Sequence, residues 1–142
     1  MSERERTAVA ARRWAQTWAA AWEALDVEPI VALYAPGTTF SSQPFRVPYR
    51  GREGVRDYVS SAFAAEFGPR VWMSAPIVDG NRASVSWWCS VREDGRDTTL
   101  AGTSVLRFDP DGLVAEQWDA WNVLDRRSDP PIGWSPFADR DD

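Results

Sequence analysis

The first half of the chain places hydrophobic residues at helical spacing. Trp14, Trp18 and Trp22 recur every four residues between positions 4 and 25, while charged residues fall on the other faces. This period predicts an amphipathic helix over 4–25. A tryptophan stripe of this kind is typical of a side that faces the core, and Trp18 either packs in that core or lines a pocket beside it.

Two further helices are predicted before position 68. The second covers 27–35, with Asp26 as its N-cap and Pro36–Gly37 as its stop. The third covers about 53–67 and ends at Gly68–Pro69. Between them we expect a short extended piece at 38–42 and a proline-containing loop at 43–53.

From about position 70 onwards, the period of the hydrophobic pattern changes to two residues. β-rich segments at 70–78, 82–93, 97–108 and 113–124 are separated by three turns, each of which contains Asp-Gly. Helices followed by such a meander predict an α+β fold, with the helices packed on one face of a curved antiparallel sheet. We expect a single domain over 1–142 with an irregular, proline-rich tail at 125–142. Trp134 and Phe137 predict that the middle of this tail docks across a cavity mouth or on a partner subunit, with the last five residues frayed.

Alternation along the last strand draws attention to one carboxylate. Gln117, Asp119 and Trp121 share a face of the segment 113–124, whereas Trp118 lies on the opposite face. In the segment 82–93 the apolar face contains Trp87, so Asp119 and Trp87 are predicted to lie on the same side of the sheet. An ionisable group among tryptophans is either a general base in an apolar pocket or a polar strand residue satisfied by a neighbouring partner.

Composition narrows the possible chemistry. Nine tryptophans in 142 residues supply enough aromatic area to line a large cavity or fill a large core. The net charge of -5 disfavours nucleic acid as a partner. The chain has no histidine, which excludes nucleophile systems with an imidazole base, and Cys89 is read as a buried apolar residue. No metal or other cofactor is expected. Without histidine, proton transfer at neutral pH would have to use a carboxylate, a tyrosine, a water molecule supported by arginine, or the lone thiol.

The hydropathy of the chain predicts neither a signal peptide nor a membrane span. The first 14 residues are charged and lack an apolar stretch, and no run of about 18 apolar residues occurs. We therefore expect a cytoplasmic protein that has no membrane partner.

Several phrases resemble a known superfamily. The order of elements, together with "ALYAPGTTFSSQPF", "YRGREGVRDYV" and "FDPDGLVAEQWDAWN", is similar to NTF2-like proteins over about residues 8–124, and within them to SnoaL-like proteins. These are related to polyketide cyclases, ketosteroid isomerases and limonene epoxide hydrolases. The resemblance implies a cone in which helices and a curved sheet enclose an apolar pocket. It also implies a homodimer.

The resemblance also tests individual positions. The isomerase base falls at Ser42, its oxyanion tyrosine at Trp18 and its protonated aspartate at Ser104, so that mechanism is not retained. The family's aromatic pocket walls fall at Trp87 and Trp121. Asp119 matches the acid/base aspartate of SnoaL-type cyclases and one aspartate of the epoxide hydrolases. The histidine of the cyclases and the second aspartate of the hydrolases have no counterpart here.

The expected function is a cofactor-free enzyme, an isomerase, cyclase or hydrolase acting on a small apolar molecule. Desolvation would raise the pKa of Asp119 towards neutrality and make it a general acid or base. The candidate substrate-binding residues are Trp18, Tyr34, Ser42, Trp87, Ser104, Gln117 and Trp121. Gln117, Ser42, Ser104 and Tyr34 are also possible hydrogen-bonding partners of the carboxylate, and the indole N–H of Trp18 is a possible donor to a substrate carbonyl.

Two other functions remain open. The same pocket could hold a hydrophobic metabolite without catalysis, or Trp88 and Trp118 on the outer face could form a dimer or partner surface. The arginines at 46, 50 and 52 could steer an anionic ligand, although a solvated loop is the plainer interpretation. The acids of "FDPDG" are read as a hairpin turn and not as a calcium site.

Overall fold

The computed structural model describes residues 1–134. Helix α1 (Glu3–Ala24) begins with a capping box, in which the Ser2 hydroxyl accepts from the Glu5 amide and the Glu5 carboxylate accepts from the Ser2 amide. It ends at Leu25, whose φ of 53° places it in the left-handed region. Every tryptophan of the predicted stripe is buried, so this helix forms as the periodicity predicts.

The second predicted helix is only partly present. Helix α2 (Glu28–Val31) is a single turn, and Val27, not Asp26, occupies its N-cap position. Strand β1 (Tyr34–Ser41) already begins before Pro36–Gly37. The predicted helical end is therefore wrong: this dipeptide lies inside a strand, where the pairing with β7 (Val114–Leu124) shifts register between Tyr34 and Thr39.

The third helix is shorter than predicted. Strand β2 (Tyr49–Arg50) pairs with β1, and helix α3 (Gly51–Ala64) follows it directly. Phe67 was assigned to the helix but belongs to strand β3 (Glu66–Met73), where its side chain is 75% exposed. Gly68–Pro69 again lies within a strand, at a register shift against β5 (Arg82–Glu93). Proline cannot donate to a ladder, which accounts for the irregularity.

The meander forms as predicted from position 82 onwards, but the predicted segment 70–78 is divided into the end of β3 and a separate short strand, with a break at 74–76. Strands β4 (Ile77–Asp79), β5 (Arg82–Glu93), β6 (Arg96–Phe108) and β7 (Val114–Leu124) pair antiparallel in sequence. The sheet order is β2-β1-β7-β6-β5-β3, with β4 beside β5. One pair differs from the antiparallel prediction, because β1 runs parallel to β7.

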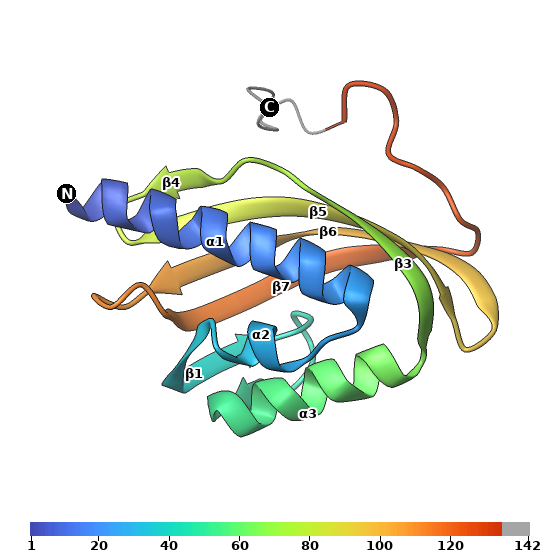
Figure 1. Ribbon diagram of the computed structural model, residues 1–142, viewed down its shortest axis with the longest axis horizontal. Coiled ribbons are helices and arrows are strands. Elements are labelled where there is room, and N and C mark those ends of the chain that lie inside the picture. Colours follow the sequence, from blue (N-terminus) through green and yellow to red (C-terminus); the bar gives the residue numbers. More distant parts are fainter. Residues whose placement is uncertain (135–142) are drawn as a thin grey trace.

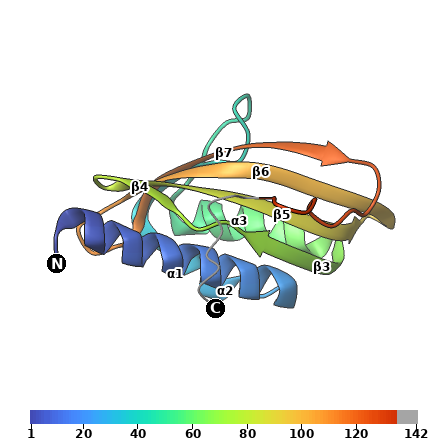
Figure 2. The ribbon, with the colours of Figure 1, turned by 90° about the horizontal axis from the view of Figure 1, so that it is seen from above.

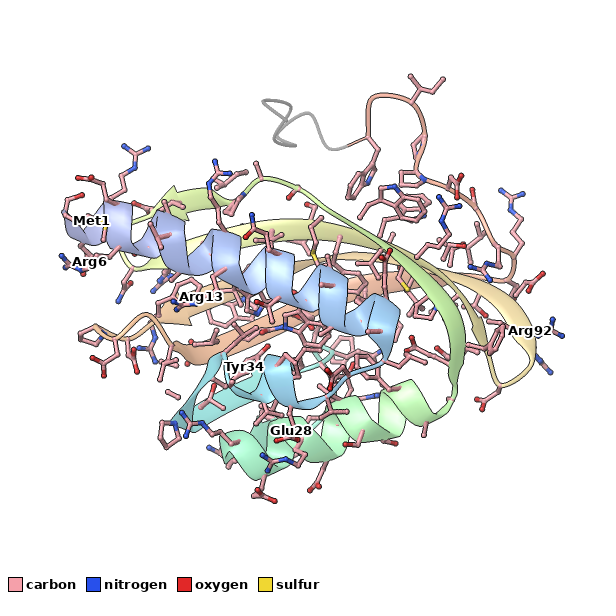
Figure 3. The ribbon with its side chains drawn as sticks, in the orientation of Figure 1. Met1, Arg6, Arg13, Glu28, Tyr34 and Arg92 are labelled. Carbon is pink, nitrogen blue, oxygen red and sulfur yellow. The ribbon has the colours of Figure 1, made fainter. Side chains whose placement is uncertain are left out.

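The helices lie on one face of this curved sheet, which does not close into a barrel (Figures 1 and 2). Side chains fill the space between the two layers, and Tyr34 lies in this interior (Figure 3). The predicted α+β class is confirmed. No helix among residues 1–134 is long and apolar enough to cross a membrane.

The tail after β7 returns along the outer face of the sheet. The Trp88 indole N–H donates to the Ser128 carbonyl at 2.7 Å, and the rings of Trp88 and Trp134 meet edge to face. Arg127 donates to the side chain and the carbonyl of Ser90. This part of the tail therefore docks on the outer face and not across a cavity mouth. Phe137 and the last five residues lie outside the described residues.

Candidate active site

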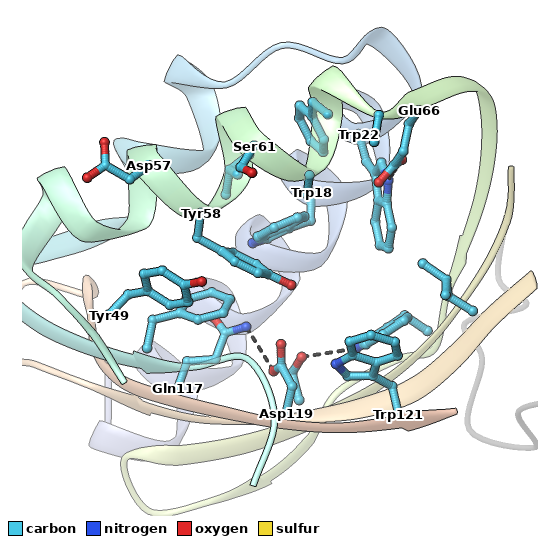
Figure 4. A pocket seen from close by; sticks show the side chains of 18 of the residues that line it. Trp18, Trp22, Tyr49, Asp57, Tyr58, Ser61, Glu66, Gln117, Asp119 and Trp121 are labelled. Atoms are coloured by element: carbon cyan, nitrogen blue, oxygen red, sulfur yellow. Dashed lines mark hydrogen bonds between the residues drawn. The ribbon is translucent and has the colours of Figure 1, made fainter. Parts of the chain in front are cut away.

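A cavity of about 500 Å³ lies between the inner face of the sheet and the helices (Figure 4). The inward positions of β5, β6 and β7 form its floor, and α1 and α3 contribute the opposite wall. Aromatic side chains dominate the lining, namely Trp14, Trp18, Trp22, Phe40, Tyr49, Tyr58, Phe63, Trp87 and Trp121. A cavity of this size and apolar character matches the usual dimensions of small-molecule sites.

Asp119 is a polar group in the floor of this cavity. It is 7% exposed and lies directly opposite Ser104 of the neighbouring strand. The Gln117 amide nitrogen donates to its Oδ1 at 3.0 Å, and Ser104 forms a second hydrogen bond to the carboxylate. Burial nevertheless outweighs these two bonds and raises the pKa of Asp119 to about 7. The carboxyl group can therefore gain or lose a proton near neutral pH.

Tyr34, which is buried outside the cavity lining, determines the orientation of the Gln117 side-chain amide. The indole N–H groups of Trp14 and Trp18 both donate to the Tyr34 hydroxyl, at 3.3 and 3.1 Å. Since the hydroxyl oxygen accepts these bonds, its own proton is directed to Gln117 Oε1. The amide then has its NH₂ group facing Asp119. Each donor in this chain thus points towards the carboxylate.

A second series of hydrogen bonds reaches Asp119 from the neighbouring strands β5 and β6. The Trp87 indole donates to Ser104 Oγ at 3.0 Å, which leaves the serine proton free to bond Asp119. Two chains therefore converge on one buried acceptor. The arrangement orients the carboxylate and supports its charged form, while the dry surroundings favour the neutral form.

Trp121 is positioned by close backbone contacts. Its indole N–H donates to the Ser42 carbonyl at 2.6 Å, and its Cα lies opposite Gly102. A Cβ atom at position 102 would lie 2.5 Å from the Cβ of Trp121 and 2.4 Å from the Ala120 carbonyl oxygen. Glycine at this position therefore allows the indole to lie against the floor of the cavity beside Asp119.

Five of the candidate binding residues line the cavity: Trp18, Trp87, Ser104, Gln117 and Trp121. Tyr34 and Ser42 do not. Tyr34 is fully buried behind Gln117, and Ser42 presents its carbonyl to Trp121 while its hydroxyl lacks a hydrogen-bonding partner. The Trp18 N–H was expected to be available to a substrate carbonyl, but the structure engages it with Tyr34.

The sequence reasoning missed a second carboxylate. Glu66, the first residue of β3, lines the cavity and accepts a 2.7 Å hydrogen bond from the Trp22 indole. Burial raises its pKa to about 7. Glu66 was not identified from the sequence because the predicted third helix, at about 53–67, included it. Tyr49 and Tyr58 also line the cavity and were not identified from the sequence.

The arginines of the loop before α3 have different environments. Arg46 lines the cavity, Arg50 is exposed, and Arg52 donates to the Tyr34 carbonyl at 2.8 Å. Only the first is therefore placed to meet a ligand in the cavity.

The "FDPDG" stretch forms the predicted turn, because Asp109 Oδ1 accepts from the backbone amides of Asp111 and Leu113. Among residues 1–134, no group of three or more His, Cys, Asp or Glu side chains is arranged to hold a metal ion.

Comparison with known proteins supports the resemblance seen in the sequence. A family model described as a SnoaL-like domain matches residues 15–117, which covers most of the helices and the strands of the cavity floor. A search of curated proteins finds no match. The matched segment includes Gln117 and ends two residues before Asp119. The chain belongs to the SnoaL-like domain family, within the NTF2-like superfamily.

Proposed function

We propose that the cavity is the active site of a cofactor-independent enzyme, an isomerase, cyclase or hydrolase, in which Asp119 transfers a proton to or from an apolar substrate. The observation that carries this proposal is the environment of the carboxyl group. It is buried among aromatic side chains, held by Gln117 and Ser104, and has a pKa of about 7. A general acid or base works best when its pKa lies near the working pH.

The proton transfer uses the residues already described. Ionised Asp119 takes a proton from a carbon next to a substrate carbonyl, and the electron pair of the C–H bond moves towards the carbonyl oxygen. The same carboxyl group can return the proton to another carbon of the enolate, which completes an isomerisation. In a ring closure, the enolate carbon instead attacks a second carbonyl carbon of the substrate, and the carboxyl group gives its proton to the alkoxide oxygen that forms. Gln117 and Ser104 stabilise the carboxylate before the transfer and after the proton is returned. An epoxide is the alternative reactive group.

The substrate is expected to be mainly apolar. Trp121 lies beside the carboxyl group (Figure 4), Trp87 contacts its neighbour Ser104, and the other aromatic residues of the lining offer apolar area and few hydrogen bonds. Such a wall selects substrates by their shape and by the apolar area they bury, and a small number of polar contacts fix the orientation of the substrate.

The test is a proton-exchange assay with a matched variant. A panel of apolar ketones is incubated in D₂O with the wild-type protein and with Asp119→Asn, and deuterium uptake beside the carbonyl is followed by NMR; a parallel panel of aryl epoxides is followed for hydrolysis. Asp119→Asn should lose the activity by about 10²-fold or more. Equal rates in the two proteins would exclude Asp119 as the proton-transfer group.

The rival function is a non-catalytic receptor for a hydrophobic metabolite. It is supported by the same aromatic lining and predicts that Asp119→Asn binds ligands as the wild type does, with no turnover in either protein. The exchange assay therefore distinguishes the two functions.

A homodimer formed through the outer face of the sheet is proposed as well. Trp118 lies on that face and is 37% exposed, which supports a partner surface. Trp88 is a weaker candidate than the sequence predicted, because the tail residues Ser128 and Trp134 contact it. A cytoplasmic location remains a prediction of the sequence.

A further inference from the structure

Glu66 is a cavity carboxylate that the proposed proton transfer does not use. It stands at the start of β3, and Figure 4 shows it beside Trp22, on a different wall of the cavity from Asp119. Its Oε1 accepts the Trp22 indole N–H at 2.7 Å. Within residues 1–134 no other side chain hydrogen-bonds to Glu66, so Oε2 retains acceptor capacity for a ligand.

Among residues 1–134, no positively charged side chain forms an ion pair with Glu66. Its cross-strand partner is Glu93, another carboxylate that lines the cavity. The repulsion from Glu93 adds to burial in raising the pKa of Glu66. Like charges opposite each other in a sheet are destabilising, so a cation from outside the chain would relieve this pair.

The surrounding walls are suited to a cation. Trp22, the indole that contacts Glu66, meets Trp18 and Trp87 edge to face, with ring centroids 5.8 and 5.7 Å apart, so three indoles of the cavity lining adjoin one another on this side. Organic ammonium groups bind to aromatic faces because the negative face of the ring attracts the cation. The described lining contains the carboxylates Asp57, Glu66, Glu93 and Asp119 against the single arginine Arg46.

We infer that Glu66 determines specificity for a protonated amine: the ligand is an apolar organic ammonium compound whose cationic group contacts Glu66 Oε2 and the indole of Trp22. This inference rests on the proposed use of the cavity as a small-molecule site and narrows its substrate class. Asp119 then meets the reacting part of the same molecule.

Three probes of similar size and shape test the inference: 1-naphthylmethylammonium, 1-naphthylmethanol and 1-naphthoate. Their affinities are measured by calorimetry and by quenching of tryptophan fluorescence at pH 8, where the amine is protonated and Glu66 is mainly ionised. The wild type should bind the ammonium at least about tenfold more tightly than the alcohol, because a hydrogen bond between charged groups is stronger than one to a neutral group. It should bind naphthoate least.

The matched variants are Glu66→Gln and Glu116→Gln. The first keeps an oxygen acceptor for the Trp22 indole, so the fold and the affinity for the alcohol should be retained while the preference for the ammonium is lost. The second makes the same charge change on the opposite face of β7, outside the cavity, and should keep the preference. Glu93→Gln should weaken the preference without abolishing it, and checks the result independently of any folding defect at position 66.

The outcomes separate the two proposals. Equal affinity for the ammonium and the alcohol in the wild type, or an unchanged preference in Glu66→Gln, overturns the role of Glu66 and leaves the role of Asp119 intact. Failure of all three probes to bind overturns both, because the cavity would then not accept aromatic compounds of this size. Loss of turnover in Asp119→Asn with the ammonium preference retained supports both.

Discussion

The side-chain amide of Gln117 donates a 3.0 Å hydrogen bond to Oδ1 of Asp119, two residues further along the same strand. The period of two in a β-strand places both side chains on the inner face, so their contact follows directly from their spacing. Tyr34 fixes which end of the amide faces the carboxylate. The charge state of Asp119 therefore depends on a residue that lies behind the cavity wall.

Gln117→Leu should raise the pKa of Asp119 above its value of about 7. The variant removes a hydrogen-bond donor to the charged carboxylate, while the carboxyl group stays buried. The neutral form is then favoured further, and the pKa should rise by about one unit or more. NMR titration of the aspartate carboxyl carbons measures the shift. Gln16→Leu, on the exposed side of α1, is the control and should leave the value unchanged. A lowered pKa in Gln117→Leu would contradict this account of the donor chain.

Stability should depend on pH through Asp119. Its pKa is raised in the folded state, so the folded protein binds more protons than the unfolded chain between about pH 4 and pH 7. The contribution of Asp119 to the free energy of unfolding is therefore fully present below about pH 4 and is lost as the pH rises through about 7.

Asp119→Asn removes this dependence, because an amide does not titrate. At pH 8 the variant should be more stable than the wild type by about 2–4 kcal/mol, and the difference should shrink as the pH falls towards 4. Urea unfolding at several pH values measures it. If the variant is less stable than the wild type at pH 8, burial of the Asp119 charge is not the main destabilising effect at this position.

Gly102→Ala should destabilise the protein and displace Trp121. The added methyl group would meet the backbone of Ala120 and Trp121 at 2.4–2.8 Å, where only the strands themselves can move. Overpacking of this kind costs about 1–3 kcal/mol. Chemical unfolding and the fluorescence of Trp121 report the two effects. Gly37→Ala is the matched control, since a Cβ there has no neighbour within 4 Å, and it should be close to neutral.

Trp118→Ser tests the proposed dimer. If the outer face is the interface, light scattering should give a dimer for the wild type and a monomer for the variant, because an aromatic residue in an interface contributes strongly to binding. The 37% exposure of Trp118 makes a folding defect in the variant a small concern. An unchanged mass for Trp118→Ser would exclude this face as the interface.

Periodicity in the sequence predicted the elements that depend on long regular patterns. Helix α1, strands β5 to β7 and the inward direction of Asp119 all follow from hydrophobic spacing over ten or more residues. The predictions that failed depend on proline and glycine. Pro36–Gly37 and Gly68–Pro69 stop helices in most sequences, but here each lies in a strand at a register shift, where the irregular pairing tolerates a missing amide.

The failures at the site have the same origin. The helix assigned through position 67 concealed Glu66, and its contact with Trp22 joins residues 44 apart in the sequence. Tyr34 was predicted as a direct partner of the site, but it acts through Gln117, a contact across 83 residues. Spacing along one element can place a side chain on a face. It cannot identify which side chain from another element meets it there.

The most direct test of the central claim is the ionisation of Asp119 itself. Carbon-13 NMR of protein labelled at the aspartate carboxyl carbons, titrated from pH 3 to pH 9 and assigned by the resonance missing in Asp119→Asn, follows this group alone. The buried, donor-supported carboxyl group described above predicts a midpoint near pH 7. A midpoint near the ordinary aspartate value of about 4 would show that water reaches the group, and would contradict its role as a proton-transfer residue at neutral pH.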